Sequence, residues 1–173
     1  RSYTEPFAAE DVPEELPPYH RNQLVLPKDV GANVAFLRGW QQQFEGDSFD
    51  FDYHYMWDHF LDPGYHGMTR TLWADMRNLK EIGLDGLISC QVQRAFFPSG
   101  LGMTVMARTL WDDSLALEEI TRDYYASAFG EDADQAGSYL ASLSRLFDPP
   151  YLRGERPDAD AEAAERLDQV PAL

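Results

Sequence analysis

Aromatic and polar residues alternate along residues 48–57, more regularly than anywhere else in the chain. One parity carries five aromatic residues, and the other carries mostly polar ones: Phe49, Phe51, Tyr53, Tyr55 and Trp57 against Asp50, Asp52, His54, Met56 and Asp58. Successive side chains of a strand point to opposite faces, so the pattern predicts a strand with an aromatic face and a polar face. We expect the first aromatic residues, Phe49 and Phe51 above all, to pack in the core beneath a helix.

Helical periodicity flanks this strand on both sides. Apolar residues recur at spacings of three and four in residues 33–44 and 68–82, and residues 84–90 form a short apolar run typical of a buried strand. The order strand, helix, strand across residues 49–92 predicts a βαβ unit with a parallel pair. Beyond Pro98 the pattern is wholly helical, with segments expected at residues 102–111, 114–129, 133–147 and 157–170.

Composition narrows the classes of partner. Lys and Arg number 14 and Asp and Glu number 30, which gives a formal charge of −16. Such a charge repels phosphate backbones and anionic lipid headgroups, so we expect neither nucleic acid nor a membrane surface as a partner. No apolar stretch approaches the ~18 residues of a membrane span. Gly100-Leu-Gly102 lacks the rest of a phosphate-binding glycine motif, and no cofactor is expected.

Cys90 is the single cysteine of the chain, so an intramolecular disulfide is excluded. It lies in an apolar run, which favours a buried small side chain over a nucleophile. One cysteine fits a cytoplasmic protein and does not exclude export. The sequence therefore leaves localisation open, with the cytoplasm favoured.

Four short motifs together resemble a known group of proteins. They are FDYHYMWDH at residues 51–59, LKEIGLDG at residues 79–86, SCQVQRAF at residues 89–96 and TLWD at residues 109–112. Their order and spacing resemble the end of the catalytic barrel in uncharacterised bacterial glycoside-hydrolase-like proteins, which are distantly similar to α-glucuronidases and hexosaminidase-type glycosidases. The resemblance covers most of the chain.

This resemblance implies an α/β fold: the carboxyl-terminal part of a (β/α)8 barrel of the TIM type, followed by a helical tail. Residues 1–98 would hold the last barrel strands and helices, with strands six, seven and eight at residues 2–6, 49–58 and 87–93, and residues 99–173 would form the helical region. The earlier strands would lie upstream of Arg1. Two parallel strands alone leave unpaired edges, so we expect the isolated chain to self-associate or to pair with a missing amino-terminal part.

Active sites of such barrels form at the carboxyl ends of the strands, which directs attention to residues 53–59. Flat aromatic faces that pack on a pyranose ring occur there beside groups that bond hydroxyls. Asp58 is the candidate catalytic carboxylate. Candidate substrate-binding residues are Tyr53, His54, Tyr55, Trp57 and His59 on this segment, with Gln91, Gln93 and Arg94 on the next strand.

The expected function is binding or hydrolysis of a carbohydrate, such as a uronic acid or an acetamido sugar. A glycosidase needs two carboxyl groups about 5–9.5 Å apart, whereas Asp52 and Asp58 would lie about 20 Å apart on one strand at ~3.3 Å per residue. The second carboxylate would come from elsewhere, and the fragment alone is expected to be inactive. Two alternatives stay open: a carbohydrate-binding barrel without catalysis, and a metal-dependent hydrolase that uses Asp52 and His54. No H-x-x-x-H or H-E-x-x-H spacing supports a metal site, and none is predicted.

Overall fold

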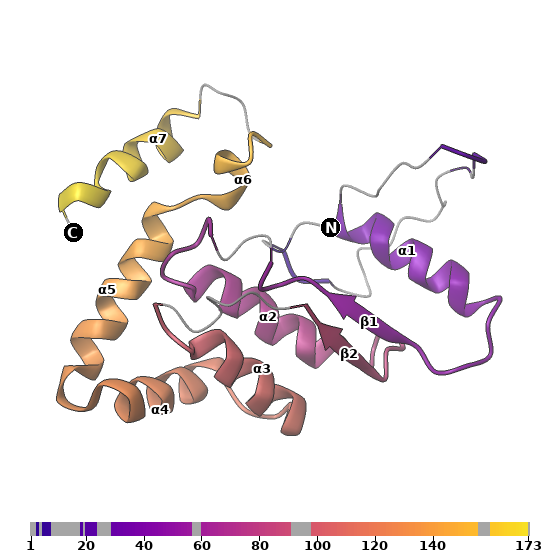
Figure 1. Cartoon of the computed structure of the whole chain (residues 1–173), viewed down its shortest axis with the longest axis horizontal. Coiled ribbons are helices and arrows are strands. Elements are labelled where there is room, and N and C mark those ends of the chain that lie inside the picture. The colour runs from indigo at the N-terminus through magenta and orange to yellow at the C-terminus, as the bar shows by residue number, and fades with distance from the viewer. Residues whose placement is uncertain are drawn as a thin grey trace.

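The computed structural model describes residues 3, 5–7, 18, 20–23, 29–56, 60–90, 98–155 and 160–172. Helices dominate this part of the chain, and two short strands interrupt them (Figure 1). In chain order the elements are α1 (Val30–Gln41), β1 (Phe49–Asp52), α2 (His66–Asn78), β2 (Gly86–Ser89), α3 (Leu101–Trp111), α4 (Leu117–Phe129), the 3-10 turn η1 (Gly130–Asp132), α5 (Ala133–Leu146), α6 (Pro149–Leu152), α7 (Ala161–Asp168) and the 3-10 turn η2 (Val170–Ala172).

The predicted βαβ unit is confirmed. β1 and β2 pair in parallel, with Phe49 opposite Gly86 and Asp52 opposite Ser89, and α2 makes the crossover between them. Figure 1 shows the sheet and α2 in the middle of the molecule, with α1 at one end and α4 to α7 at the other. The unit follows from local patterning, because an alternating segment, an apolar helical stripe and a short apolar run succeed one another along the chain.

The predicted partial (β/α)8 barrel is wrong. The described part of the chain contains one sheet of two strands, and most of its residues are helical. Helices α3, α4 and α5 pack in succession on α2 and on one another instead of surrounding a barrel. Tyr3, Glu5 and Pro6, expected in strand six, lie in bends or irregular backbone. Strand number is not encoded in local periodicity, and the barrel had come from the resemblance of short motifs.

Strand β1 is also shorter than predicted, and the face that it turns toward the core is the opposite of the predicted one. It ends at Asp52 because the chain then enters a turn, and its aromatic residues Phe49 and Phe51 are 63% and 52% exposed. Asp52, on the opposite parity, is fully buried. The assignment of the first aromatic residues to the core is therefore wrong, since this strand turns a polar face inward.

Two apolar clusters hold the described elements together. The first joins α1, α2 and the turn after β1 through buried side chains that include Val34, Tyr55 and Leu72. The second joins α3, α4 and α5 around Val105 and Ile120, which are both fully buried. Each fully buried aliphatic side chain contributes about 1.5–3 kcal/mol relative to exposure, so the two clusters are the main source of stability.

Polar contacts join the start of α2 to α5, and the loop before α2 lies very close to the α5 backbone. Asp62 is buried, and its carboxylate accepts hydrogen bonds from the Met68 amide at 2.8 Å and from the Ser144 hydroxyl. The same hydroxyl accepts a bond from the His66 amide at 2.8 Å. These contacts satisfy amides at the start of α2, where a helix has no internal acceptors. Gly64 lies so near α5 that a Cβ there would be 1.9 Å from the Leu140 carbonyl oxygen.

Aspartate side chains cap the amino-terminal ends of three described helices. Asp29 and Asp160 cap α1 and α7 by accepting hydrogen bonds from amides three residues on. Asp148 likewise caps α6, a short helix that begins with the Pro149-Pro150 pair. Proline is compatible with the first turn of a helix because no internal acceptor faces the amide it lacks. None of the described helices is both long enough and apolar enough to cross a membrane.

Candidate functional site

An aromatic groove lies between α1 and β1. It encloses about 310 Å³, at the small end of the range for small-molecule sites. The aromatic groove is lined by Tyr3, Phe7, Asn33, Val34, Leu37, Phe49, Asp50, Phe51, Tyr53, Ile82 and Leu84. Five of these residues are aromatic, and one amide and one carboxylate lie among them, so the groove combines flat apolar surfaces with groups that bond hydroxyls.

The outward face of β1 supplies one wall of this groove. Phe49 and Phe51 project from alternate positions of the strand, and the Phe51 ring meets the Tyr53 ring edge to face with centroids 5.1 Å apart. Exposed phenylalanine rings held on a strand keep their apolar surface available to a ligand. An exposed apolar patch of this kind is typical of a binding surface.

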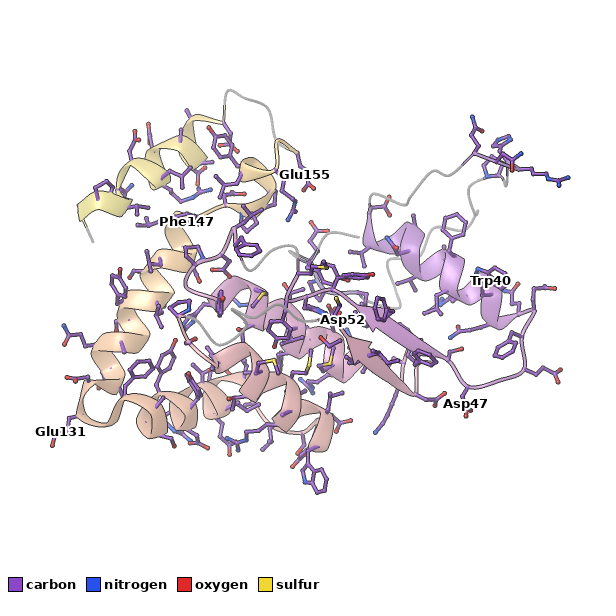
Figure 2. The ribbon with its side chains drawn as sticks, in the orientation of Figure 1. Trp40, Asp47, Asp52, Glu131, Phe147 and Glu155 are labelled. Atoms are coloured by element: carbon purple, nitrogen blue, oxygen red, sulfur yellow. The ribbon has the colours of Figure 1, made fainter. Side chains whose placement is uncertain are left out.

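The inward side of β1 carries a buried ion cluster, Asp52–His54–Asp75. Asp52 lies at the middle of the molecule, where β1 passes α2 (Figure 2). All three side chains have zero exposure. The His54 ring is bonded at Nδ1 to Asp52 and at Nε2 to Asp75, the latter at 2.7 Å. The Ser89 hydroxyl donates to the second Asp52 oxygen at 3.1 Å, so β1, α2 and β2 meet at this cluster.

The opposite charges of the cluster stabilise one another and shift the pKa values of its members. Burial acts against the imidazolium, but hydrogen bonds to Asp52 and Asp75 and the charges of both carboxylates raise the pKa of His54 above its ordinary value. Burial likewise opposes ionisation of Asp52, yet the bonds from His54 and Ser89 and the imidazolium charge hold the pKa of Asp52 below its ordinary value. A doubly protonated ring between two carboxylates satisfies both ring donors.

These opposite shifts give the stability of the protein a defined pH window. The contribution from Asp52 is complete above its unfolded pKa of about 3.9 and is lost as the pH falls through the lowered folded pKa. The contribution from His54 is complete below its unfolded pKa of about 6.5 and is lost as the pH rises through the raised folded pKa. Stability from the cluster is therefore greatest between about pH 4 and pH 6.5.

Urea unfolding between pH 3 and pH 10 checks this window. The unfolding free energy is expected to fall on both sides, by about 1.4 kcal/mol for each unit that separates folded and unfolded pKa values. In Asp75→Asn the asparagine amide can donate to a neutral His54 ring, so the folded-state pKa of His54 should be raised less, and the alkaline decline should be smaller and end at a lower pH. An alkaline decline of the same size in both proteins would contradict the assignment to His54.

The cluster also holds the amino-terminal wall of the groove. The Phe7 amide donates to Asp75 Oδ1 at 2.8 Å, and the Phe7 carbonyl accepts from Asn78 Nδ2 at 2.7 Å. The Tyr53 amide donates to the Tyr3 hydroxyl oxygen at 2.9 Å, and the Tyr3 ring stands edge-on to the His54 ring with centroids 4.5 Å apart. Two groove residues are thus attached to side chains and amides 50 or more positions away in sequence.

The residues proposed from the sequence have different positions in the structure. Tyr53 lines the groove, whereas His54 is enclosed in the ion cluster with both ring nitrogens bonded. Tyr55 is fully buried beside Gly102, and within the described part its hydroxyl has no hydrogen-bond partner. The other six candidates lie outside the described residues: Trp57, Asp58, His59, Gln91, Gln93 and Arg94.

The metal alternative relied on Asp52 and His54. The structure bonds these side chains to each other, with the second carboxylate on the opposite nitrogen of the ring. Within the described ranges, no group of three or more His, Cys, Asp or Glu side chains is arranged to hold a metal ion.

A second cavity of about 380 Å³ lies where α5, α6 and α7 approach the start of α2. Tyr3 lines both cavities. Two polar groups of the second cavity already hold elements together: Arg166 of α7 bonds Asp148 at the start of α6 at 2.8 Å, and Asp62 anchors α2 to α5. The groove, with its row of exposed rings, is the better candidate for a ligand.

Sequence reasoning missed several residues of the site. Asp75 gave a signal, because it shares the apolar stripe of α2 with Leu72, Met76 and Leu79, where a charged residue needs a buried partner. Tyr3 and Asn33 gave none, since their approach to β1 depends on how separate segments pack.

Comparison with known proteins identified no relative of this chain. The chain matches no protein-family model, no curated protein and no solved structure. The resemblance of its short motifs to glycosidase-like proteins therefore stays a prediction.

Proposed function

We propose that this protein binds carbohydrate in the aromatic groove, without hydrolysing it. The observation that carries the proposal is the pair of exposed rings, Phe49 and Phe51, on one wall of a cavity that also contains Asp50 and Asn33. A pyranose ring has an apolar face that packs on flat aromatic surfaces and a rim of hydroxyls that amides and carboxylates bond. The motif resemblance to carbohydrate-active proteins supports the same class of ligand.

Binding is favoured over hydrolysis by the carboxylates near the groove. Both retaining and inverting glycosidases need two carboxyl groups, about 5–9.5 Å apart across the scissile bond. Among the described residues that line the groove, Asp50 is the one carboxylate. Asp52 and Asp75 lie nearby but are buried on His54.

Calorimetric titration with cellohexaose, xylohexaose, the N-acetylglucosamine hexamer and a glucuronoxylan oligosaccharide tests the proposal. We expect saturable binding of at least one of them and no released sugar after prolonged incubation. Replacing Phe51 by alanine removes a ring from the groove wall and should weaken the affinity about tenfold or more, which corresponds to about 1.4 kcal/mol.

Tyr139→Ala is the matched control. Tyr139 is an exposed aromatic residue on α5 and does not line the groove, so its removal should leave the affinity unchanged. Equal losses in the two variants, or no binding to any of the four sugars, would show that the groove is not a carbohydrate site. Release of sugar by the wild-type protein would replace binding with hydrolysis.

A further inference from the structure

We propose that His54 is a positioning residue for the aromatic groove: the Asp52–His54–Asp75 cluster holds Tyr3 and Phe7 in place as one wall, so that ligand binding depends on the proton of a side chain the ligand never touches. The inference rests on the proposed function, because it concerns the regulation of that same groove. His54 itself does not line the groove and has zero exposure.

The attachment of the wall is continuous in the structure. Asp75 Oδ2 bonds the His54 ring at 2.7 Å, and its other oxygen accepts the Phe7 amide at 2.8 Å. One carboxylate therefore joins the histidine to the groove wall. On the other side of the ring, Tyr3 packs edge-on against His54 and its hydroxyl accepts the Tyr53 amide. A change in the ring position moves both contacts.

Within the described ranges, the groups that face His54 come from several different segments. Asp52 faces it from β1, Asp75 from α2 and the Tyr3 ring from the amino-terminal segment. From β2, Ser89 reaches Asp52 with its hydroxyl. Burial and the charge of Asp52 raise the pKa of Tyr55, which lies in the turn after β1, so this phenol stays neutral wherever His54 titrates.

Loss of one ring proton from His54 removes one of its two hydrogen bonds to carboxylates. A neutral imidazole has one N–H, so it can donate to Asp52 or to Asp75 but not to both. The carboxylate that loses the imidazole donor keeps its buried position without the nearby positive charge, which is unfavourable. Such a carboxylate is stabilised if it moves toward water. If Asp75 moves, Phe7 moves with it, because its amide is bonded to that carboxylate.

The experiment compares two midpoints in the wild-type protein. Affinity for cellohexaose and for the N-acetylglucosamine hexamer, both uncharged, is measured between pH 5.5 and pH 9.5, and the His54 ring is followed by NMR over the same range. We expect the affinity to fall about tenfold or more with the midpoint at which His54 loses its proton. An affinity that stays constant while His54 titrates overturns the proposal.

Two glutamine variants separate positioning from general stability. His54→Gln keeps a polar side chain but cannot titrate, so its affinity should be lower than that of the wild type and independent of pH. His66→Gln, on the far side of α2 beside Tyr125, should keep the wild-type pH profile. A wild-type profile in His54→Gln overturns the proposal, and if that variant does not fold, the comparison of midpoints in the wild-type protein still decides.

A measurement without ligand distinguishes this inference from the proposed function. Protection of the Phe7 amide against hydrogen exchange, relative to its intrinsic rate, should fall as His54 loses its proton, whereas protection of the Ile120 amide in α4 should not. If none of the four sugars of the calorimetric titration binds at any pH, the proposed function fails, and the Phe7 amide then tests the positioning alone. Constant Phe7 protection through the His54 titration overturns it.

Discussion

Replacing His54 by alanine is expected to lower the free energy of unfolding by about 3–5 kcal/mol, a large share of the total stability of a small protein. The variant removes the imidazolium that lies between two carboxylates of zero exposure. Asp52 would keep the Ser89 hydroxyl and Asp75 the Phe7 amide, but neither bond neutralises a charge. A buried carboxylate that loses the imidazolium must either take up a proton or draw water into the core, and both reduce stability.

Urea unfolding at pH 6 measures this loss, and His66→Ala provides the control. His66 is half-buried, and its ring bonds the Tyr125 hydroxyl at 3.0 Å and stacks near the Tyr125 ring without a carboxylate bonded to it. Its removal should cost only about 1–2 kcal/mol. Similar losses in the two alanine variants would mean that the charge of the cluster contributes little to stability.

Substituting Gly64 by alanine should cost about 3 kcal/mol, the upper end of the usual range for an inserted methyl group. The added Cβ would lie 1.9 Å from the Leu140 carbonyl oxygen and 2.8 Å from the Ser144 amide nitrogen. Backbone atoms cannot rotate away, so α5 must shift as a unit. That shift would pull the Ser144 hydroxyl from Asp62 and from the start of α2.

Gly86→Ala is the matched control for this substitution, because no atom lies within 4 Å of a Cβ at that position of β2. Its unfolding free energy should change by less than about 0.5 kcal/mol, as for surface positions in general. Thermal or urea unfolding of the two variants compares them directly. A Gly64→Ala protein as stable as Gly86→Ala would show that α5 does not approach the loop before α2 this closely.

Local patterns in the sequence predicted most of the elements. The apolar spacing of residues 102–111 and 133–147 anticipated α3 and α5 to within one residue at each end, because helical periodicity is a property of the segment itself. The parallel pair followed from the order of strand, helix and strand. The predicted end of β1 was wrong. The alternation of aromatic and polar residues continues past Asp52, but the extended backbone of the strand ends there.

The candidate site was harder to predict than the helices and strands. Alternation in residues 48–57 shows that two faces differ, but it does not show which face turns inward. Hydrophobicity favoured burial of Phe49 and Phe51, and the structure buries Asp52 and His54 instead. The polar face could be buried because Asp75, 23 residues beyond Asp52 on α2, completes a set of charges that satisfy one another.

The sequence by itself determined that this protein has a βαβ unit followed by helices, that its formal charge is −16, and that residues 49–59 carry an unusual concentration of aromatic and polar side chains. Only the tertiary structure decided that the sheet has two strands in the described part of the chain, that the rings of β1 face outward into a groove, and that His54 lies between two carboxylates. The physical reason is that periodicity acts between neighbours in sequence. The burial of a charge, in contrast, depends on partners that only folding brings together.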